Sequence, residues 1–248
     1  MLLPTLGLLL STTLCALSVT PPVSAEPLPP GGGADRFTVA QDFSLVMTIR
    51  DIKKNGKVHE AVIRMGALDD RFALISTDDG EGVVSQMIYN TEDRKTTMVT
   101  TDKKGRKQGF RMRMPKLGNV IAATTDEMAE YITISRTGER KTIDGYDCEK
   151  IIVTDNKHNT TTESWVTQDV DLTYADVFGG LSNLSGVGKQ QFKTPGGAPA
   201  VLEGMPIRST TTDGKTTTEM YITDIRLGDD LDRSLFDTGG VEIQEMRF

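Results

Sequence analysis

The sequence is poor in the residue types that most often carry catalysis or bind metals. Among 248 residues there are two cysteines, two histidines and one tryptophan. His59 and His158 belong to no His-x-His or His-Glu-x-x-His spacing, so no zinc site is indicated. A nucleophile elbow, a phosphate-binding loop and a dinucleotide fingerprint are also missing from the sequence. We therefore expect a protein that is not an enzyme and that holds no metal and no cofactor.

Basic residues are also fewer than acidic ones. The formal net charge is -7, with 28 Lys and Arg against 35 Asp and Glu. A nucleic-acid partner requires a basic surface that displaces counterions, and an anionic membrane surface attracts clusters of Lys and Arg. The composition therefore argues against nucleic acid as a partner.

Long apolar runs are confined to the N-terminus. The run from Leu6 to Val19 is too short to cross a bilayer, and Val23-Ser24-Ala25 supplies the small residues of a cleavage site. We expect residues 1–25 to be a signal peptide, so the protein is predicted to be periplasmic or secreted. No transmembrane segment is expected after cleavage. Residues 26–38 are rich in Pro and Gly and are predicted to form a disordered tether, and residues 39–248 a single domain.

Cleavage would leave Cys148 as the only cysteine, which excludes an intramolecular disulfide. No histidine lies near it in the sequence, so its thiol has no neighbour that would favour the thiolate. A lone cysteine beside strand-forming residues is typically a small buried side chain. We interpret Cys148 as part of the core.

The dominant pattern of the remaining chain has a period of two. Apolar Phe43, Leu45 and Met47 alternate with smaller or polar residues, which is typical of a strand with one buried face. Hairpin turns are indicated at Asn55-Gly56 and Asp213-Gly214. Frequent threonine also favours extended backbone. The mature chain is predicted to be mainly β.

Two segments follow a helical period instead. One is Pro115–Tyr131, and the other runs from Tyr174 to Leu184 with apolar residues three and four positions apart. The predicted fold is therefore mainly β (α+β): a single curved antiparallel sheet, or unclosed half-barrel, with helices covering its concave face.

Four short motifs support a family assignment. They are Gly145-Tyr146-Asp147-Cys148-Glu149-Lys150, Trp165-Val166-Thr167, Gly204-Met205-Pro206 and the closing Leu235-Phe236-Asp237. In order and spacing the sequence resembles an uncharacterised family of secreted bacterial proteins that is similar to the periplasmic lipoprotein carriers, the LolA-like fold. The resemblance implies an unclosed half-barrel with helices over an apolar cavity. It supplies no binding residue, because the motifs themselves look structural: a turn at Gly145, a packed Trp165 and a strand that begins again after Gly204.

Methionine is concentrated on the predicted strands. Met side chains are flexible and polarizable, so they can line a cavity that accepts variable acyl chains, but they also serve as ordinary core filler. Both interpretations stay open at this point. If there is a cavity, its candidate lining residues are Phe43, Leu45, Met47, Ile63, Met65, Phe110, Met112, Met114, Trp165, Val177, Phe178, Leu181, Met220 and Ile222.

The resulting hypothesis is an exported, non-enzymatic protein that binds a lipid or the acyl chain of a lipidated protein between sheet and helices. The alternative is an envelope protein-interaction or structural module with a packed core and no ligand. A compact, filled core with no cavity would count against the first, and an exposed apolar patch over a packed interior would favour the second.

Overall fold

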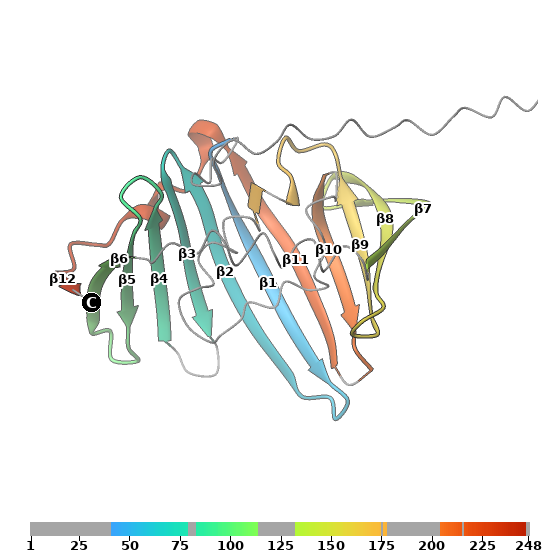
Figure 1. The fold of residues 1–248 in the computed structure, drawn as a ribbon, viewed down its shortest axis with the longest axis horizontal. Coiled ribbons are helices and arrows are strands. Elements are labelled where there is room, and N and C mark those ends of the chain that lie inside the picture. Colours follow the sequence, from blue (N-terminus) through green and yellow to red (C-terminus); the bar gives the residue numbers. More distant parts are fainter. Residues whose placement is uncertain are drawn as a thin grey trace, which may run out of the picture. The chain divides into compact units, whose positions relative to one another are not determined.

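In the computed structural model, the described residues are 41–78, 83–113, 132–174, 176–177, 204–214 and 216–246. They form one open sheet of 12 strands in the order β12-β6-β5-β4-β3-β2-β1-β11-β10-β9-β8-β7 (Figure 1). The strands are β1 (Phe43–Lys53), β2 (Val58–Leu68), β3 (Arg71–Asp78), β4 (Val83–Asn90), β5 (Lys95–Thr101), β6 (Lys107–Arg113), β7 (Ile132–Ile143), β8 (Tyr146–Asp155), β9 (Thr160–Thr167), β10 (Met205–Thr212), β11 (Thr216–Leu227) and β12 (Ile243–Met246). The predicted signal peptide and tether, residues 1–25 and 26–38, lie outside the described residues.

Tight turns join most neighbouring strands, and their residues explain the pairing. Between β7 and β8, Asp144 and Gly145 both have positive φ, 51° and 89°. Two such residues in succession form the turn whose twist matches an antiparallel hairpin. In the β1–β2 turn, Gly56 alone has positive φ, 78°. The motif that begins at Gly145 is therefore a hairpin followed by a strand.

Gly204 has a different role, which is close approach of two backbones. Its φ is +103°, and a Cβ at this position would lie 2.5 Å from the carbonyl oxygen of Thr167. This close approach lets β10 begin at Met205 directly against the end of β9, where Met205 pairs with Thr167. A side chain at position 204 would thus separate the two strands where their pairing begins.

Replacing Gly204 with Ala should therefore destabilise the protein more than replacing Gly214 with Ala. Gly214 also has positive φ, +77°, but a Cβ there would meet no atom within 4 Å. Both variants carry backbone strain of about 1–2 kcal/mol, and only Gly204→Ala adds an overpacking cost of about 1–3 kcal/mol. Urea unfolding of both variants measures the difference; equal losses would contradict the role assigned to Gly204.

The main core lies on one face of the sheet, centred on β1, β2 and β11. Register pairs Leu45 with Met65, and Met47 with both Ile63 and Ile222. These side chains are at most 2% exposed. Because side chains alternate along a strand, they all point to the same face. Leu172, Tyr174 and Val177, from the segment after β9, pack into the same cluster.

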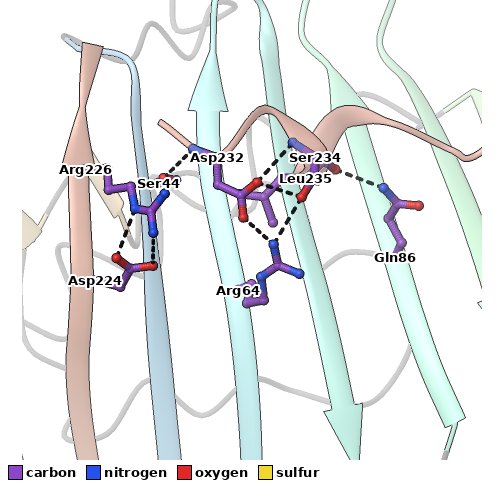
Figure 2. A network of polar contacts seen from close by, with 8 residues as sticks. All are labelled: Ser44, Arg64, Gln86, Asp224, Arg226, Asp232, Ser234 and Leu235. Atoms are coloured by element: carbon purple, nitrogen blue, oxygen red, sulfur yellow. Dashed lines mark hydrogen bonds and ion pairs between the residues drawn. The ribbon is translucent and has the colours of Figure 1, made fainter. Parts of the chain in front are cut away.

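The C-terminal segment crosses the opposite face. After β11 it forms two short 3-10 helices, Gly228–Asp230 and Arg233–Phe236. Leu235 is 1% exposed and packs with Ala73 of β3 and Ile88 of β4. Gln86 Nε2 donates to the backbone oxygen of Leu235 at 2.9 Å (Figure 2). It also donates to the backbone oxygen of Asp237 at 3.0 Å. The Leu235-Phe236-Asp237 motif is therefore an anchor of this segment on the sheet.

The prediction that helices cover the concave face is wrong. Besides strands and turns, the described residues include the two 3-10 helices and the helical residues Tyr174, Asp176 and Val177, but no helix that covers a face of the sheet. The predicted segment 115–131 lies outside the described residues, as does most of 174–184. In its described part, Tyr174 and Val177 are buried against the main core. Tyr174 and Val177 are helical, so the predicted period is present locally, where it packs these two side chains on the core.

Two strands have no counterpart in the sequence prediction. β7 forms one edge of the sheet, and all of its side chains except Ile132, Ile134 and Ile143 are exposed, so its apolar alternation is confined to its first residues. β12 has four residues and pairs with β6 in parallel, with Ile243 opposite Gly109. A Cβ at Gly109 would lie 2.5 Å from Ile243 Cδ1, so this glycine makes room for the edge strand.

Candidate functional site

An apolar row of side chains runs across six neighbouring strands on the face of the main core. We call it the methionine row; strand register joins its members directly, in the order Leu45, Met65, Leu74, Met87, Met98 and Phe110. Side chains that oppose each other across antiparallel strands lie close enough to touch. The row therefore forms a continuous apolar strip from β1 to β6.

Burial changes along this row. Leu45, Met65 and Leu74 are 2%, 0% and 3% exposed, whereas Met87, Met98 and Phe110 are only partly buried. A second row lies beside it on the same face, joining Phe72, Tyr89, Thr96 and Met112 by register. Tyr89 and Met112 are also partly buried. The half-buried side chains Met87, Tyr89, Met98, Phe110 and Met112 form a patch on β4–β6, which we call the outer apolar patch.

The structure brings most of the predicted lining residues to this face. Eight belong to the main buried cluster: Phe43, Leu45, Met47, Ile63, Met65, Val177, Met220 and Ile222. Phe110 and Met112 lie in the outer apolar patch. Met114, Phe178 and Leu181 lie outside the described residues. Whether any of these side chains contacts a ligand stays a prediction.

Trp165 is placed on the other face of the sheet. Its neighbour Ser164 faces Ser209 across β9 and β10, their hydroxyls 2.8 Å apart, whereas Trp165 pairs with Arg208. The ring packs at the margin of the main core and is only partly buried. The ammonium groups of Lys141 and Lys150 each lie 6.0 Å from its centroid. The Trp165 ring therefore lies beside two lysines, on the face opposite the one that carries Met220.

The sequence prediction missed the outer part of the site. Leu74, Met87, Tyr89 and Met98 were not among its candidates, yet register connects them to Met65 and Phe110. The signal that identifies them is alternation within β3–β5, read together with the order of consecutive hairpins. Register decides which alternating residues share a face, and a single strand cannot supply it.

Groups suited to catalysis are not gathered in the described residues. Cys148 is 0% exposed, and burial raises the pKa of its thiol, which disfavours the nucleophilic thiolate. His59 lies on β2, and His158 lies in the turn between β8 and β9, with β1, β11 and β10 between their strands. His158 Nδ1 lies 2.7 Å from an Asp155 carboxylate oxygen, a local contact within that turn. Within the described ranges, no three metal-ligating side chains converge.

A polar hollow of about 130 Å³ lies near the β7 edge of the sheet. Its charged groups are already matched: Arg136 contacts Glu149 at 2.9 Å, and Arg140 contacts Asp147 at 2.5 Å. The Asp169 carboxylate accepts the backbone N–H of Asp147 at 2.8 Å. These pairs connect β7 to β8. Because the charged side chains already have partners within the protein, no ligand is needed to explain their arrangement.

Asp232 is the polar anchor of the C-terminal segment. Its carboxylate accepts the Ser234 hydroxyl at 2.6 Å and forms an ion pair with Arg64 of β2 (Figure 2). The Ser234 hydroxyl and then the Arg64 guanidinium lower the pKa of the Asp232 carboxyl. Its backbone N–H donates to the Ser44 hydroxyl on β1 at 2.9 Å. The segment is thus fixed to β1 and β2 before Leu235 reaches β3 and β4.

A lowered carboxyl pKa makes the stabilisation by Asp232 pH-dependent. The contribution is fully present above the unfolded-state pKa of about 3.9 and is lost as the pH falls through the lower folded-state pKa. Because both side chains reach solvent, we expect no more than about 1 kcal/mol. Urea unfolding of the wild type and Asp232→Asn should show a difference at neutral pH that shrinks in acid. A difference that is constant down to strongly acid pH would contradict this role.

No helix in the described part of the chain combines the length and apolar character needed to cross a membrane.

Comparison with solved structures finds coarse likenesses to several bacterial proteins. A LolA superfamily protein from Nitrosomonas europaea is 12% identical, over 83% of this chain and 93% of that one, with a TM-score of 0.31. A protein described as an outer membrane lipoprotein-sorting domain from Vibrio parahaemolyticus is 10% identical, over 79% and 89%, with a TM-score of 0.31. PNGF-II is 17% identical with a TM-score of 0.36; the match covers 84% of this chain but only 31% of PNGF-II.

TM-scores of this size describe a broad similarity of architecture, so the chain's own residues have to carry any functional inference. No curated protein matches the sequence. One family model does match, a domain of unknown function designated DUF4412, over residues 43–238. These residues run from the start of β1 through the 3-10 helix that anchors the C-terminal segment. The chain therefore belongs to the DUF4412 family.

Proposed function

We propose that this protein is an exported, non-enzymatic binding protein for an apolar ligand of the acyl-chain class, and that the outer apolar patch on β4–β6 is its contact surface. The ligand would be a lipid or the acyl chain of a lipidated protein. The proposal replaces the predicted cavity beneath helices with a surface at one end of the sheet.

One observation carries the proposal: the methionine row stays apolar where it stops being buried. The first three members of the row, Leu45, Met65 and Leu74, are buried in the core. Met87, Met98 and Phe110 continue the same row but are partly exposed. A sheet face that meets only water normally changes to polar side chains. An apolar strip that continues from the core into solvent is typical of a binding surface.

The residue types in the patch suit flexible apolar chains. Met87 and Met98 are direct cross-strand neighbours, and Phe110 pairs with Met98. Unbranched thioether side chains adapt to ligands of different shape, and each buried apolar side chain contributes about 1.5–3 kcal/mol. Ser85, Thr100 and Gln108, which pair along the next row, limit the patch on one side.

A photoactivatable fatty acid tests the location of the site. The full chain is irradiated with a diazirine-bearing fatty acid, digested, and searched by mass spectrometry for labelled peptides. We expect label on peptides from β4, β5 and β6, and competition by unlabelled fatty acid should remove it.

A matched apolar side chain on the other face provides the control. Val58 of β2 is 45% exposed, and its pairing with Ile52 places it on the face opposite Met65. Label on the β2 peptide containing Val58 at the level of the β5 peptide would indicate nonspecific hydrophobic capture. Label that is uniform, or absent from β4–β6, would favour an interaction module without a ligand.

A further inference from the structure

A second pocket lies on the face opposite the methionine row, beneath the C-terminal segment. Its volume is about 250 Å³. Ile75, Val84 and Val99 line it from three consecutive strands, β3, β4 and β5. Register places Ile75 opposite Gln86, and Gln86 opposite Val99, so these residues share the face on which Gln86 holds Leu235 and Asp237. The pocket therefore has an apolar floor and a wall made by the C-terminal segment.

The wall and rim carry charges of both signs. Arg64 is neutralised by its ion pair with Asp232 and also donates to the Ser234 hydroxyl at 3.1 Å. Lys107 and Asp237 also line the pocket, and among the described residues neither takes part in an ion pair. Among the described residues, the pocket thus presents one cation and one anion that are not ion-paired, above an apolar floor.

Gly239 holds these two charges near each other. Its backbone N–H donates to Asp237 Oδ1 at 2.8 Å, which leaves the other carboxylate oxygen available. A Cβ on Gly239 would lie 3.2 Å from Lys107 Nζ, so the ammonium group rests against this glycine. Gly239 has φ of +63°, a conformation that glycine adopts without strain. The two charged groups therefore flank one turn without contacting each other.

We propose that this pocket binds a free amino acid with an apolar side chain. The carboxylate of the ligand would meet Lys107, its ammonium group would meet Asp237, and its side chain would lie on Ile75, Val84 and Val99. A simple anion would be repelled by Asp237 and a simple cation by Lys107, whereas a zwitterion satisfies both. The volume is below the roughly 300–1,000 Å³ of pockets for drug-sized ligands, so a small occupant is indicated.

This site is independent of the apolar ligand proposed above. The register of β2 places Arg64 and Met65 on opposite faces, and the pocket belongs to the face of Arg64. Failure of either proposal would leave the other unchanged.

Three related probes separate the contributions of the two charges. Leucine carries both charged groups, N-acetyl-leucine only the carboxylate, and leucinamide only the ammonium group. Each is titrated into the ¹⁵N-labelled full chain, and the backbone amides of Thr238 and Gly239 report binding at the pocket. We expect leucine to shift these amides at lower concentration than either analogue does.

Two variants then assign each charge to its partner. Lys107→Gln should weaken leucine binding about tenfold or more, because a hydrogen bond to a charged group is lost, but should not weaken leucinamide binding, since leucinamide loses a repulsive neighbour. Asp237→Asn should weaken leucine binding similarly but not that of N-acetyl-leucine, which loses a repulsive neighbour while the amide oxygen still accepts the Gly239 N–H. Lys103→Gln, in the turn between β5 and β6 and outside the pocket, is the matched control.

Either of two results would overturn the proposal. One is no movement of the Thr238 and Gly239 amides at millimolar leucine. The other is equal or tighter binding of N-acetyl-leucine or leucinamide, which would make the pocket a site for one charge only.

Discussion

Changing Met98 to Asp is expected to reduce affinity for a fatty-acid probe by at least about tenfold. Met98 is the middle member of the outer apolar patch, paired with Met87 on one side and Phe110 on the other. A carboxylate there removes an apolar contact of about 1.5–3 kcal/mol and places a charge beside the bound chain. Titration with a fluorescent fatty acid, such as cis-parinaric acid, measures the change in dissociation constant.

The effect has to be separated from loss of folding and from nonspecific charge effects. Met98 is only partly buried, so the variant should fold, and its far-ultraviolet circular dichroism should match that of the wild type. Val58→Asp introduces the same charge at an exposed apolar position on the other face and should bind the probe as the wild type does. Met98→Gln, which is close to methionine in shape, should give an intermediate loss. Wild-type affinity in a folded Met98→Asp variant would contradict the assigned site.

Truncating Leu235 to Ala is expected to lower the free energy of unfolding by about 2–5 kcal/mol. Leu235 is 1% exposed and packs on Ala73 and Ile88, and a Cβ added at Gly66 would lie 3.1 Å from its Cδ1. The sheet is shaped around this side chain by small residues, so the surrounding structure has little freedom to fill the space left by truncation. Urea unfolding followed by circular dichroism provides the measurement.

The same truncation at an exposed position serves as its control. Met246 is 39% exposed at the end of β12, and Met246→Ala should change stability by less than about 0.5 kcal/mol. If Leu235→Ala costs no more than Met246→Ala, the C-terminal segment does not depend on Leu235 for its attachment. The pocket beneath that segment would then lack a fixed wall.

Local alternation was sufficient to predict the strands whose one face is buried. Phe43, Leu45 and Met47 repeat every second residue because the main core lies on one side of β1. The hairpin at Asn55-Gly56 was readable for a similar reason, since Gly56 adopts the positive φ that the turn requires. In both cases the physical cause lies within a few residues of the pattern.

The sequence does not predict features that depend on contacts between segments far apart in the chain. β7 places only Ile132, Ile134 and Ile143 against the core, so its alternation is too short to stand out, and β12 is four residues that pair with β6 far away in the sequence. Trp165 lies on the face opposite Met220, and one aromatic residue alone gives no register from which that face could be predicted. The apolar spacing at Tyr174 and Val177 predicts a helix over the concave face, whereas these two helical residues are buried in the main core. Each error concerns a contact whose partner lies on another strand.

Native mass spectrometry of the full chain, purified from its own cells without detergent, tests the binding of an apolar ligand most directly. We expect a discrete lipid-sized adduct on the wild-type protein that is strongly reduced for Met98→Asp and retained for Val58→Asp. A protein that shows only the mass of its chain, both as purified and after incubation with membrane lipids, would contradict the proposed function.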